Sequence, residues 1–193
     1  SDVCSSDLGE TRDAFEAMIA QLKRDGIEIV DRTTSSAVRD FERALDDGYV
    51  NGAVELTTYE MKWPYEQYME RFGHLLEKRV TDRMAHLKTM TPEYYESLLK
   101  SRLAMRARAH EVMAGCDGFI TLTAPGPAPV ARDHTGSRAY QIYATFMGIP
   151  AFSLPLLEAE RMPVGVQLIG AAGKGGALAA CANWLIKNFP PAR

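Results

Sequence analysis

The second half of the chain alternates short apolar segments with helical segments, and this alternation constrains the fold most. Residues 118–122, 151–154 and 164–169 are short apolar runs with β-branched and aromatic residues, a pattern typical of strands. Residues 136–147 have a helical pattern that ends at Gly148. Strands mixed with helices predict an α/β fold, in which one mixed β-sheet is flanked by helices on both faces.

The first half is mainly helical in pattern. An amphipathic helix is predicted from Glu10 to Asp25, stopped by Gly26, and residues 27–30 follow as a fourth short strand. Thr91 before Pro92 predicts a capped helix start. The further predicted helices are two within 36–61 joined by a turn at 47–48, one over 69–86, one running from 92 to 114, and one over 175–189.

The 193 residues are enough for one domain or for part of a larger one. Residues 1–8 have no initiator Met, no basic segment and no apolar segment, so they do not form a secretory signal. We expect them to be a non-native leader, with a disordered polar tail as the alternative. We expect residues 9–193 to be the C-terminal portion of a single domain.

Charge and cysteine content narrow the class of protein. The formal net charge is −3, which disfavours nucleic-acid binding. No run reaches roughly 18 apolar residues, so no membrane span is expected. Cys116 and Cys181 show no CxxC spacing, which is typical of buried thiols in a reduced, cytoplasmic protein.

The chain lacks the usual sequence signs of a nucleophile or a metal site. No GxSxG motif is present, and Ser153 lies in an apolar strand with no histidine or lysine nearby in sequence. The four histidines form no HxxxH or HExxH pair, so no metal site is predicted. The glycine-rich run 170–176 joins a strand to a helix, but it is neither GxGxxG nor a P-loop. We therefore predict a tight turn there and no cofactor.

Four segments, taken together and in order, resemble the C-terminal part of the amidase-signature family. They are Asp117–Thr123 (DGFITLT), Pro127–Pro129 (PAP), Gly148–Pro155 (GIPAFSLP) and Met162–Gly170 (MPVGVQLIG). The last two, only six residues apart, are the most specific. The resemblance extends more loosely over most of residues 9–193.

The resemblance implies amide hydrolysis by a Lys–Ser–Ser triad, in which a lysine acts through one serine to deprotonate a nucleophilic second serine. The family places these residues in its N-terminal half, within a glycine- and serine-rich run. Ser5–Ser6 lies in the suspected leader and Ser35–Ser36 lacks the glycines. We therefore assign no catalytic residue to this chain and expect the triad upstream of it.

What the resemblance implies for this portion is a wall of the substrate pocket. The segment containing Thr121, Thr123 and Pro125 corresponds to the point where the family's sheet meets the substrate. Arg138 stands ten positions before Gly148. In the A subunits of glutamine-dependent tRNA amidotransferases, an acidic residue near that position helps to hold the amino group of glutamine. Arg138 therefore favours a general amidase for small-molecule amides.

Two other functions stay open from the sequence. One is an A subunit of a glutamine-dependent tRNA amidotransferase, which would need partner subunits. The other is a non-catalytic binding or scaffold module, since no triad is found. A homodimer is also left open.

The glycine-rich run generates a first prediction. If residues 170–176 form only a turn, ATP, NAD and FAD will leave the melting temperature of the protein unchanged. A ligand present at 100 times its Kd would stabilise a true binding protein by about 2.7 kcal/mol. A saturable rise in melting temperature with any of the three would contradict the turn interpretation.

Overall fold

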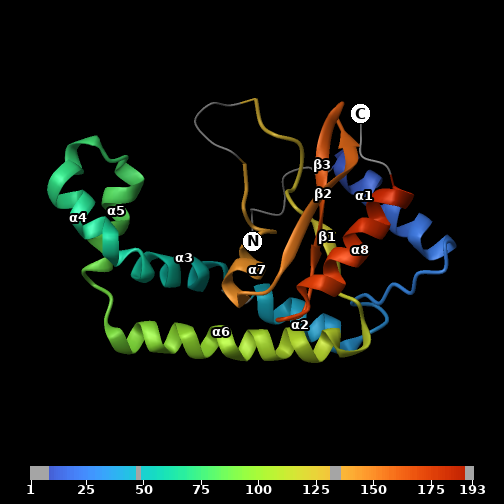
Figure 1. Ribbon diagram of the computed structural model, residues 1–193, viewed down its shortest axis with the longest axis horizontal. Helices are drawn as coiled ribbons and strands as arrows, with labels where there is room; N and C mark the ends of the chain where they lie inside the picture. Colours follow the sequence, from blue (N-terminus) through green and yellow to red (C-terminus); the bar gives the residue numbers. More distant parts are fainter. Residues whose placement is uncertain (1–8, 47–48, 131–135, 190–193) are drawn as a thin grey trace.

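The computed structural model describes residues 9–46, 49–130 and 136–189 (Figure 1). The suspected leader, residues 1–8, and the turn predicted at 47–48 lie outside the described residues. The α/β class predicted from the sequence is confirmed. In chain order the elements are α1 (Gly9–Arg24), α2 (Ser36–Asp46), α3 (Tyr49–Glu60), α4 (Lys62–Phe72), η2 (Gly73–Leu75), α5 (Lys78–Leu87), α6 (Pro92–Val112), η3 (Met113–Gly115), β1 (Phe119–Leu122), α7 (Ile142–Met147), β2 (Ala151–Ala159), β3 (Met162–Ile169) and α8 (Gly175–Asn188).

The sheet is antiparallel, where the sequence predicted a mixed sheet. Its order is β1-β3-β2, and both neighbouring pairs run antiparallel. β2 and β3 form a hairpin whose two turn residues, Glu160 and Arg161, both have positive φ. Two positive φ values are characteristic of a type I′ turn, whose twist suits a two-residue hairpin. Because β1 pairs with the other edge of β3, β3 lies between the other two strands.

β2 is longer than the predicted segment 151–154. The strand continues to Ala159 through an irregularity in register between Leu154 and Leu157. Pro155 lies within this irregularity, and proline is tolerated in strands at bulges and on edge strands because it lacks an N–H group. The bulge lets both Leu156 and Leu157 be buried.

The predicted strand at 27–30 is wrong. Gly26 adopts φ +84°, and Ile27 N–H donates to Leu22 O at 3.0 Å, which ends α1 with a left-handed glycine. The following residues pair with no described strand, and Ile27 and Val30 are each 40% exposed. Ile29 packs against the core beside the sheet. The apolar run thus reflects packing of one side chain and not strand pairing.

Two predicted helices are shorter than expected. The helix over 69–86 is interrupted after Phe72, because Leu76 and Glu77 are extended and let α5 fold back on α4. The helix over 136–147 begins only at Ile142, and it is preceded by a turn in which Gln141 N–H donates to Arg138 O at 3.0 Å.

The capped start of α6 is confirmed. Thr91 Oγ1 accepts a hydrogen bond from Tyr94 N at 3.2 Å, with Pro92 in the first turn. The α-helix ends at Val112 and continues as the short helix η3 up to Gly115, the predicted stop. No helix in the described ranges is both long and apolar enough to cross a membrane.

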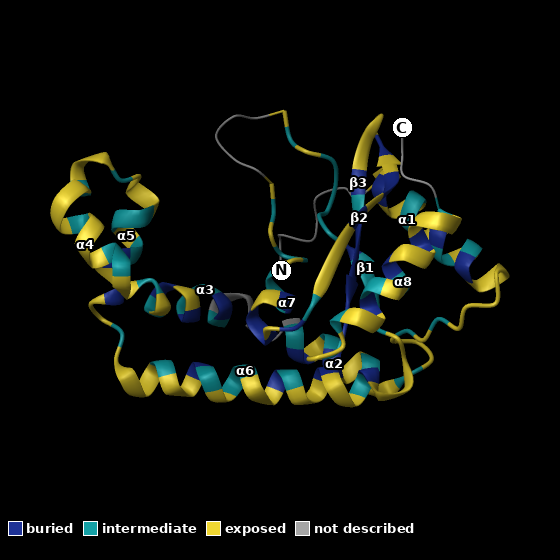
Figure 2. Cartoon of the chain, in the orientation of Figure 1, coloured by how far each residue is buried: buried dark blue, intermediate teal, exposed yellow. Residues whose placement is uncertain are grey.

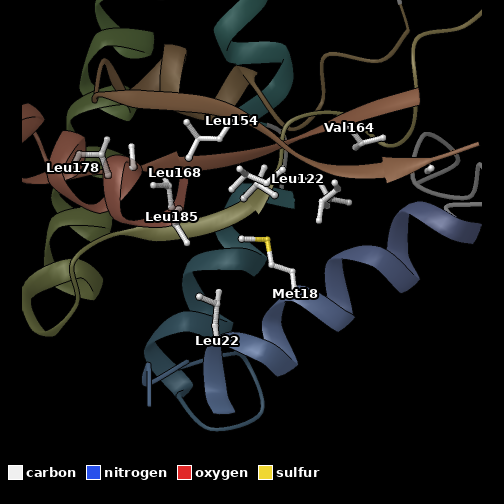
Figure 3. Packing of buried hydrophobic residues seen from close by; sticks show 13 residues of the cluster. Met18, Leu22, Leu122, Leu154, Val164, Leu168, Leu178 and Leu185 are labelled. Atoms are coloured by element: carbon white, nitrogen blue, oxygen red, sulfur yellow. The ribbon is translucent and has the colours of Figure 1, made fainter. Parts of the chain in front are cut away.

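The first core lies between the sheet and two helices. α1 and α8 pack on the same face of the sheet, and Figure 3 shows their side chains meeting those of the strands. Val166 in the central strand is 0% exposed. The members of this core are Met18, Leu22, Leu122, Leu154, Leu156, Leu157, Ala159, Val164, Val166, Leu168, Leu178, Ala182 and Leu185.

The second core joins the helical half to the other side of the sheet. It contains buried residues of α2, α3, α6 and α7 together with Ile169 of β3, and Phe119 of β1 packs against it. Phe119 stacks on Phe41 of α2 with ring centroids 5.3 Å apart. Figure 2 shows the buried stripe of α6 facing these elements, whereas α4 and α5 extend away from the sheet. The second core therefore fixes α7 beside the strands.

Two leucines on α6 give a matched stability prediction. Leu98 is 8% exposed in the second core, and Leu103 on the same helix is 60% exposed. Leu98→Ala will lower the free energy of unfolding by about 2–5 kcal/mol. Leu103→Ala will change it by less than about 0.5 kcal/mol. Urea denaturation followed by circular dichroism measures both, and equal losses would contradict the assignment of the second core.

Candidate functional site

One face of the sheet changes from apolar to polar along the strands. Ile169 pairs with Phe119 and Ala151 at the end covered by the second core. Two residues further along the same face, Gln167 pairs with Thr121 on β1 and Ser153 on β2. The face opposite α1 and α8 therefore carries a row of three polar side chains.

Two hydroxyl groups meet above the central strand. Thr123 Oγ1 and Ser153 Oγ lie 3.0 Å apart in a hydrogen bond in which either can be the donor. Thr123 N–H donates to Gly165 O at 2.8 Å, which extends the β1–β3 pairing by one residue. A Cβ atom at Gly165 would lie 2.7 Å from Thr123 Oγ1 and 2.9 Å from Ser153 Oγ. The hydroxyl pair thus depends on glycine at position 165.

Gln167 anchors the segment that precedes α7. Its side chain is buried, with the residue 4% exposed, and its Nε2 donates to Tyr140 O at 3.0 Å. A buried amide group needs such a partner. This bond ties residues 136–141 to the polar face, so that the first turn of α7 stands beside the hydroxyl pair.

A pocket of about 460 Å³ opens between α7 and this face of the sheet. That volume lies in the range of small-molecule sites. Among the described residues its lining carries no ionisable side chain; it consists of Thr123, Gln141, Ala144, Thr145, Gly148, Ile149, Ala151, Phe152, Ser153 and Gln167. The pocket therefore suits an uncharged ligand that has one polar group and one flat or apolar part.

Hydroxyl and amide side chains both donate and accept hydrogen bonds, as does a carboxamide. Thr123 and Ser153 can thus bind a substrate amide, while Phe152 and Ala144 offer apolar contacts. Covalent catalysis would also need a base beside the serine. In the described part of the chain no histidine or lysine is hydrogen-bonded to either hydroxyl. The geometry supports binding at this site.

The four residues expected at the pocket wall occupy different places. Thr123 lines the pocket, and Thr121 lies on the same face of the sheet, next to Gln167. Pro125 is half-buried in the turn after Thr123, and Arg138 is exposed in the turn before α7; neither is among the pocket-lining residues.

Sequence reasoning missed several residues of the pocket, notably Ser153, Gln167, Gln141 and Phe152. The strand context of Ser153 disfavours a nucleophile and gives no sign of a binding role. A usable signal was present, because threonine alternates with apolar residues in 120–123 (ITLT), and Gly165 and Gln167 alternate with apolar residues in 164–168 (VGVQL). Read with period two, that alternation predicts one polar face on the sheet.

The two described cysteines differ in exposure to solvent. Cys116 is exposed, so the prediction of a buried thiol there is wrong; it follows the short helix η3 at the surface. Burial raises the pKa of the half-buried Cys181 thiol, with the nearby Asp117 carboxylate as a lesser cause.

In the glycine-rich run, Lys174 N–H donates to Ala171 O at 3.0 Å, which closes the turn predicted within 170–176. In the described ranges, no three His, Cys, Asp or Glu residues are grouped so as to hold a metal ion.

Gly165 gives a prediction about the hydroxyl pair. Gly165→Ala brings a methyl group against Thr123 and Ser153, and we expect it to lower the free energy of unfolding by about 1–3 kcal/mol through overpacking. Adding Thr123→Ala removes the closest oxygen and will recover part of this loss. Thermal or urea denaturation of the single and double variants measures both effects.

Gly176→Ala is the matched control, since a Cβ there meets nothing within 4 Å in the first turn of α8. We expect that change to be neutral or stabilising, by up to about 1 kcal/mol. A Gly165→Ala variant as stable as Gly176→Ala would disprove the close contact.

Comparison with curated proteins finds A subunits of glutamyl-tRNA(Gln) amidotransferases. The subunit of a Nitratiruptor species is 26% identical over 184 residues, covering 85% of this chain and 42% of that protein. The Thermotoga maritima subunit is 27% identical over 139 residues, covering 65% of this chain and 29% of that protein. The chain thus spans less than half the length of these relatives.

Solved structures share the fold. A crystal structure of an amidase superposes with a TM-score of 0.75 at 22% identity, covering 97% of this chain and 44% of that one. The structure of 6-aminohexanoate cyclic dimer hydrolase superposes with a TM-score of 0.59 at 19% identity, covering 76% of this chain and 36% of that one. The model of the Amidase family matches residues 6–178. With most of its length matched by that model, the chain belongs to the amidase family.

Proposed function

We propose that this chain is the C-terminal, substrate-binding portion of an amidase that hydrolyses carboxylic amides to an acid and ammonia or an amine. The observation that carries the proposal is the family match across residues 6–178. The uncharged pocket beside the Thr123–Ser153 pair supports it, because it can hold a carboxamide next to an apolar wall.

In this proposal the Lys–Ser–Ser triad of the family is supplied by residues outside the sequence. The nucleophilic serine attacks the amide carbonyl carbon, the amine leaves with a proton, and water then cleaves the acyl-enzyme ester. Sequence 1–193 contains no glycine- and serine-rich run of the family's type. Its role is to bind and orient the amide, and positioning alone contributes substantially to rate.

A glutamine-specific amidotransferase subunit is the second candidate, favoured by the names of the curated relatives. Two observations favour the general amidase. Arg138 is exposed at the position where the resemblance expects an acid, and no acidic side chain is among the pocket-lining residues. A glutamine pocket needs a carboxylate or equivalent acceptors for the substrate ammonium group.

The proposal also includes the substrate class, the cofactor requirement, the location and the partners of the protein. We propose a small-molecule amide as the substrate, no cofactor, and a cytoplasmic location. The net charge of −3 supports a partner other than nucleic acid. A homodimer and a purely scaffolding role stay predictions that sedimentation and the binding experiment below will test.

The proposal predicts binding without turnover. The chain of residues 1–193 will bind benzamide, detected by saturation-transfer NMR, and will release no ammonia from benzamide, hexanamide or glutamine. Ser153→Ala removes one hydrogen bond and will weaken benzamide binding by about threefold to tenfold. Phe152→Ala will weaken it by a similar factor through lost ring contact. The control Phe72→Ala, at an exposed ring on α4, will leave binding unchanged.

Several results would contradict the proposal. Ammonia release by the purified chain that is abolished by Ser153→Ala would make Ser153 the nucleophile. Tighter binding of glutamine than of glutaramate, which has the same carboxylate but no ammonium group, would favour the amidotransferase subunit. No binding of any amide, with the fold intact by circular dichroism, would leave the scaffold interpretation.

A further inference from the structure

Two arginines of α6 converge on the glycine that ends α7. Gly148 has φ +61° and no side chain, and it lines the pocket. A Cβ atom at Gly148 would lie within 2.7 Å of Arg106 Nη2 and even closer to Arg102 Nη2. Both guanidinium groups therefore lie next to Gly148, on the α6 side of this pocket-lining residue, although neither arginine is itself among the pocket-lining residues.

The two arginines differ in their hydrogen bonds within the described part of the protein. Arg106 Nε donates to Met147 O at 2.6 Å, which satisfies a carbonyl at the end of α7. Arg102 Nε is shielded from solvent and has no hydrogen-bond partner among the residues that the structure describes. Such an unsatisfied buried donor is uncommon and costs stability.

The two positive charges also have no counter-ion in the part of the chain that the structure describes. Arg102 and Arg106 are four residues apart on one helix, where like charges repel. Within 9–46, 49–130 and 136–189, neither guanidinium group forms an ion pair with a carboxylate. No acidic side chain is among the pocket-lining residues. The uncharged lining of the pocket thus has two positive charges and their N–H donors beside it at Gly148.

We propose that Arg102 and Arg106 form a carboxylate-binding subsite at the Gly148 end of the pocket. The preferred substrate is then an amide that carries a carboxylate on the far side from its scissile bond. Guanidinium groups bind carboxylates through paired, charge-assisted hydrogen bonds. This part of the proposal rests on the proposed function, since it assumes that the amide group lies near Thr123 and Ser153.

Glutarate, which has carboxylates and no amide, probes the subsite independently of the proposed function. We expect glutarate to shift the NMR signals of the Arg102 and Arg106 Nε–H groups in the chain of residues 1–193, and to leave that of the exposed Arg108 unshifted. Unshifted Arg102 and Arg106 signals at saturating glutarate would overturn the subsite, whatever the amides do.

Three amides of similar length then test substrate preference by calorimetry: glutaramate, pentanamide and 5-aminopentanamide. We expect glutaramate to bind about tenfold more tightly than pentanamide, and 5-aminopentanamide to bind most weakly. Arg102→Gln will abolish the preference for glutaramate over pentanamide, because it removes one of the two guanidinium groups that meet at Gly148. Arg108→Gln, which removes the same charge from the same helix, will keep the preference.

The outcomes separate the two proposals. Equal binding of glutaramate and pentanamide, or a preference that survives Arg102→Gln, overturns the carboxylate subsite and leaves the amide pocket standing. Glutarate binding without binding of any amide keeps the subsite and overturns the amide pocket. Melting curves confirm that the variants are folded.

Discussion

The pairing of β3 with a strand on each side is the constraint on which the rest of the structure depends. β3 sends Val166 and Leu168 into the first core and presents Gly165 and Gln167 on the opposite face. A shift in register by one residue would exchange these sets and bury an amide among apolar side chains. The same hydrogen bonds that bury the first core therefore place the polar groups of the pocket.

The second constraint is the end of α7. Met147 is buried in the second core, and Gly148 turns the chain with a left-handed φ so that Ile149 is buried and β2 begins at Ala151. The absence of a side chain at Gly148 also lets two arginines of α6 approach. One glycine thus links the helical half, the pocket and the edge strand.

Much of this architecture can be predicted from local sequence. Thr91 with Pro92 marks the start of α6, and Gly148 marks the end of α7, because caps and left-handed glycines depend on neighbouring residues only. Strand pairing cannot be predicted in this way. Residues 27–30 are as apolar as a strand and still have no described partner strand, since pairing depends on residues distant in sequence.

The pocket residues also divide into those that the sequence predicts and those that only strand pairing brings together. Thr121 and Thr123 were predicted at the pocket wall from the resemblance, and the structure places both on the polar face. Ser153 and Gln167 join them only through sheet register, which brings together residues at least 14 positions apart in the chain. The convergence of Arg102 and Arg106 on Gly148 was equally hidden, because a stripe of basic residues on a long helix usually faces solvent.

A crystal structure of this chain soaked with benzamide tests directly whether the pocket binds an amide. We expect electron density for the amide within hydrogen-bonding distance of Thr123 or Ser153, and for the ring against Phe152. Benzamide bound at another site, with the pocket beside Gly165 left empty in the same crystal, would contradict it.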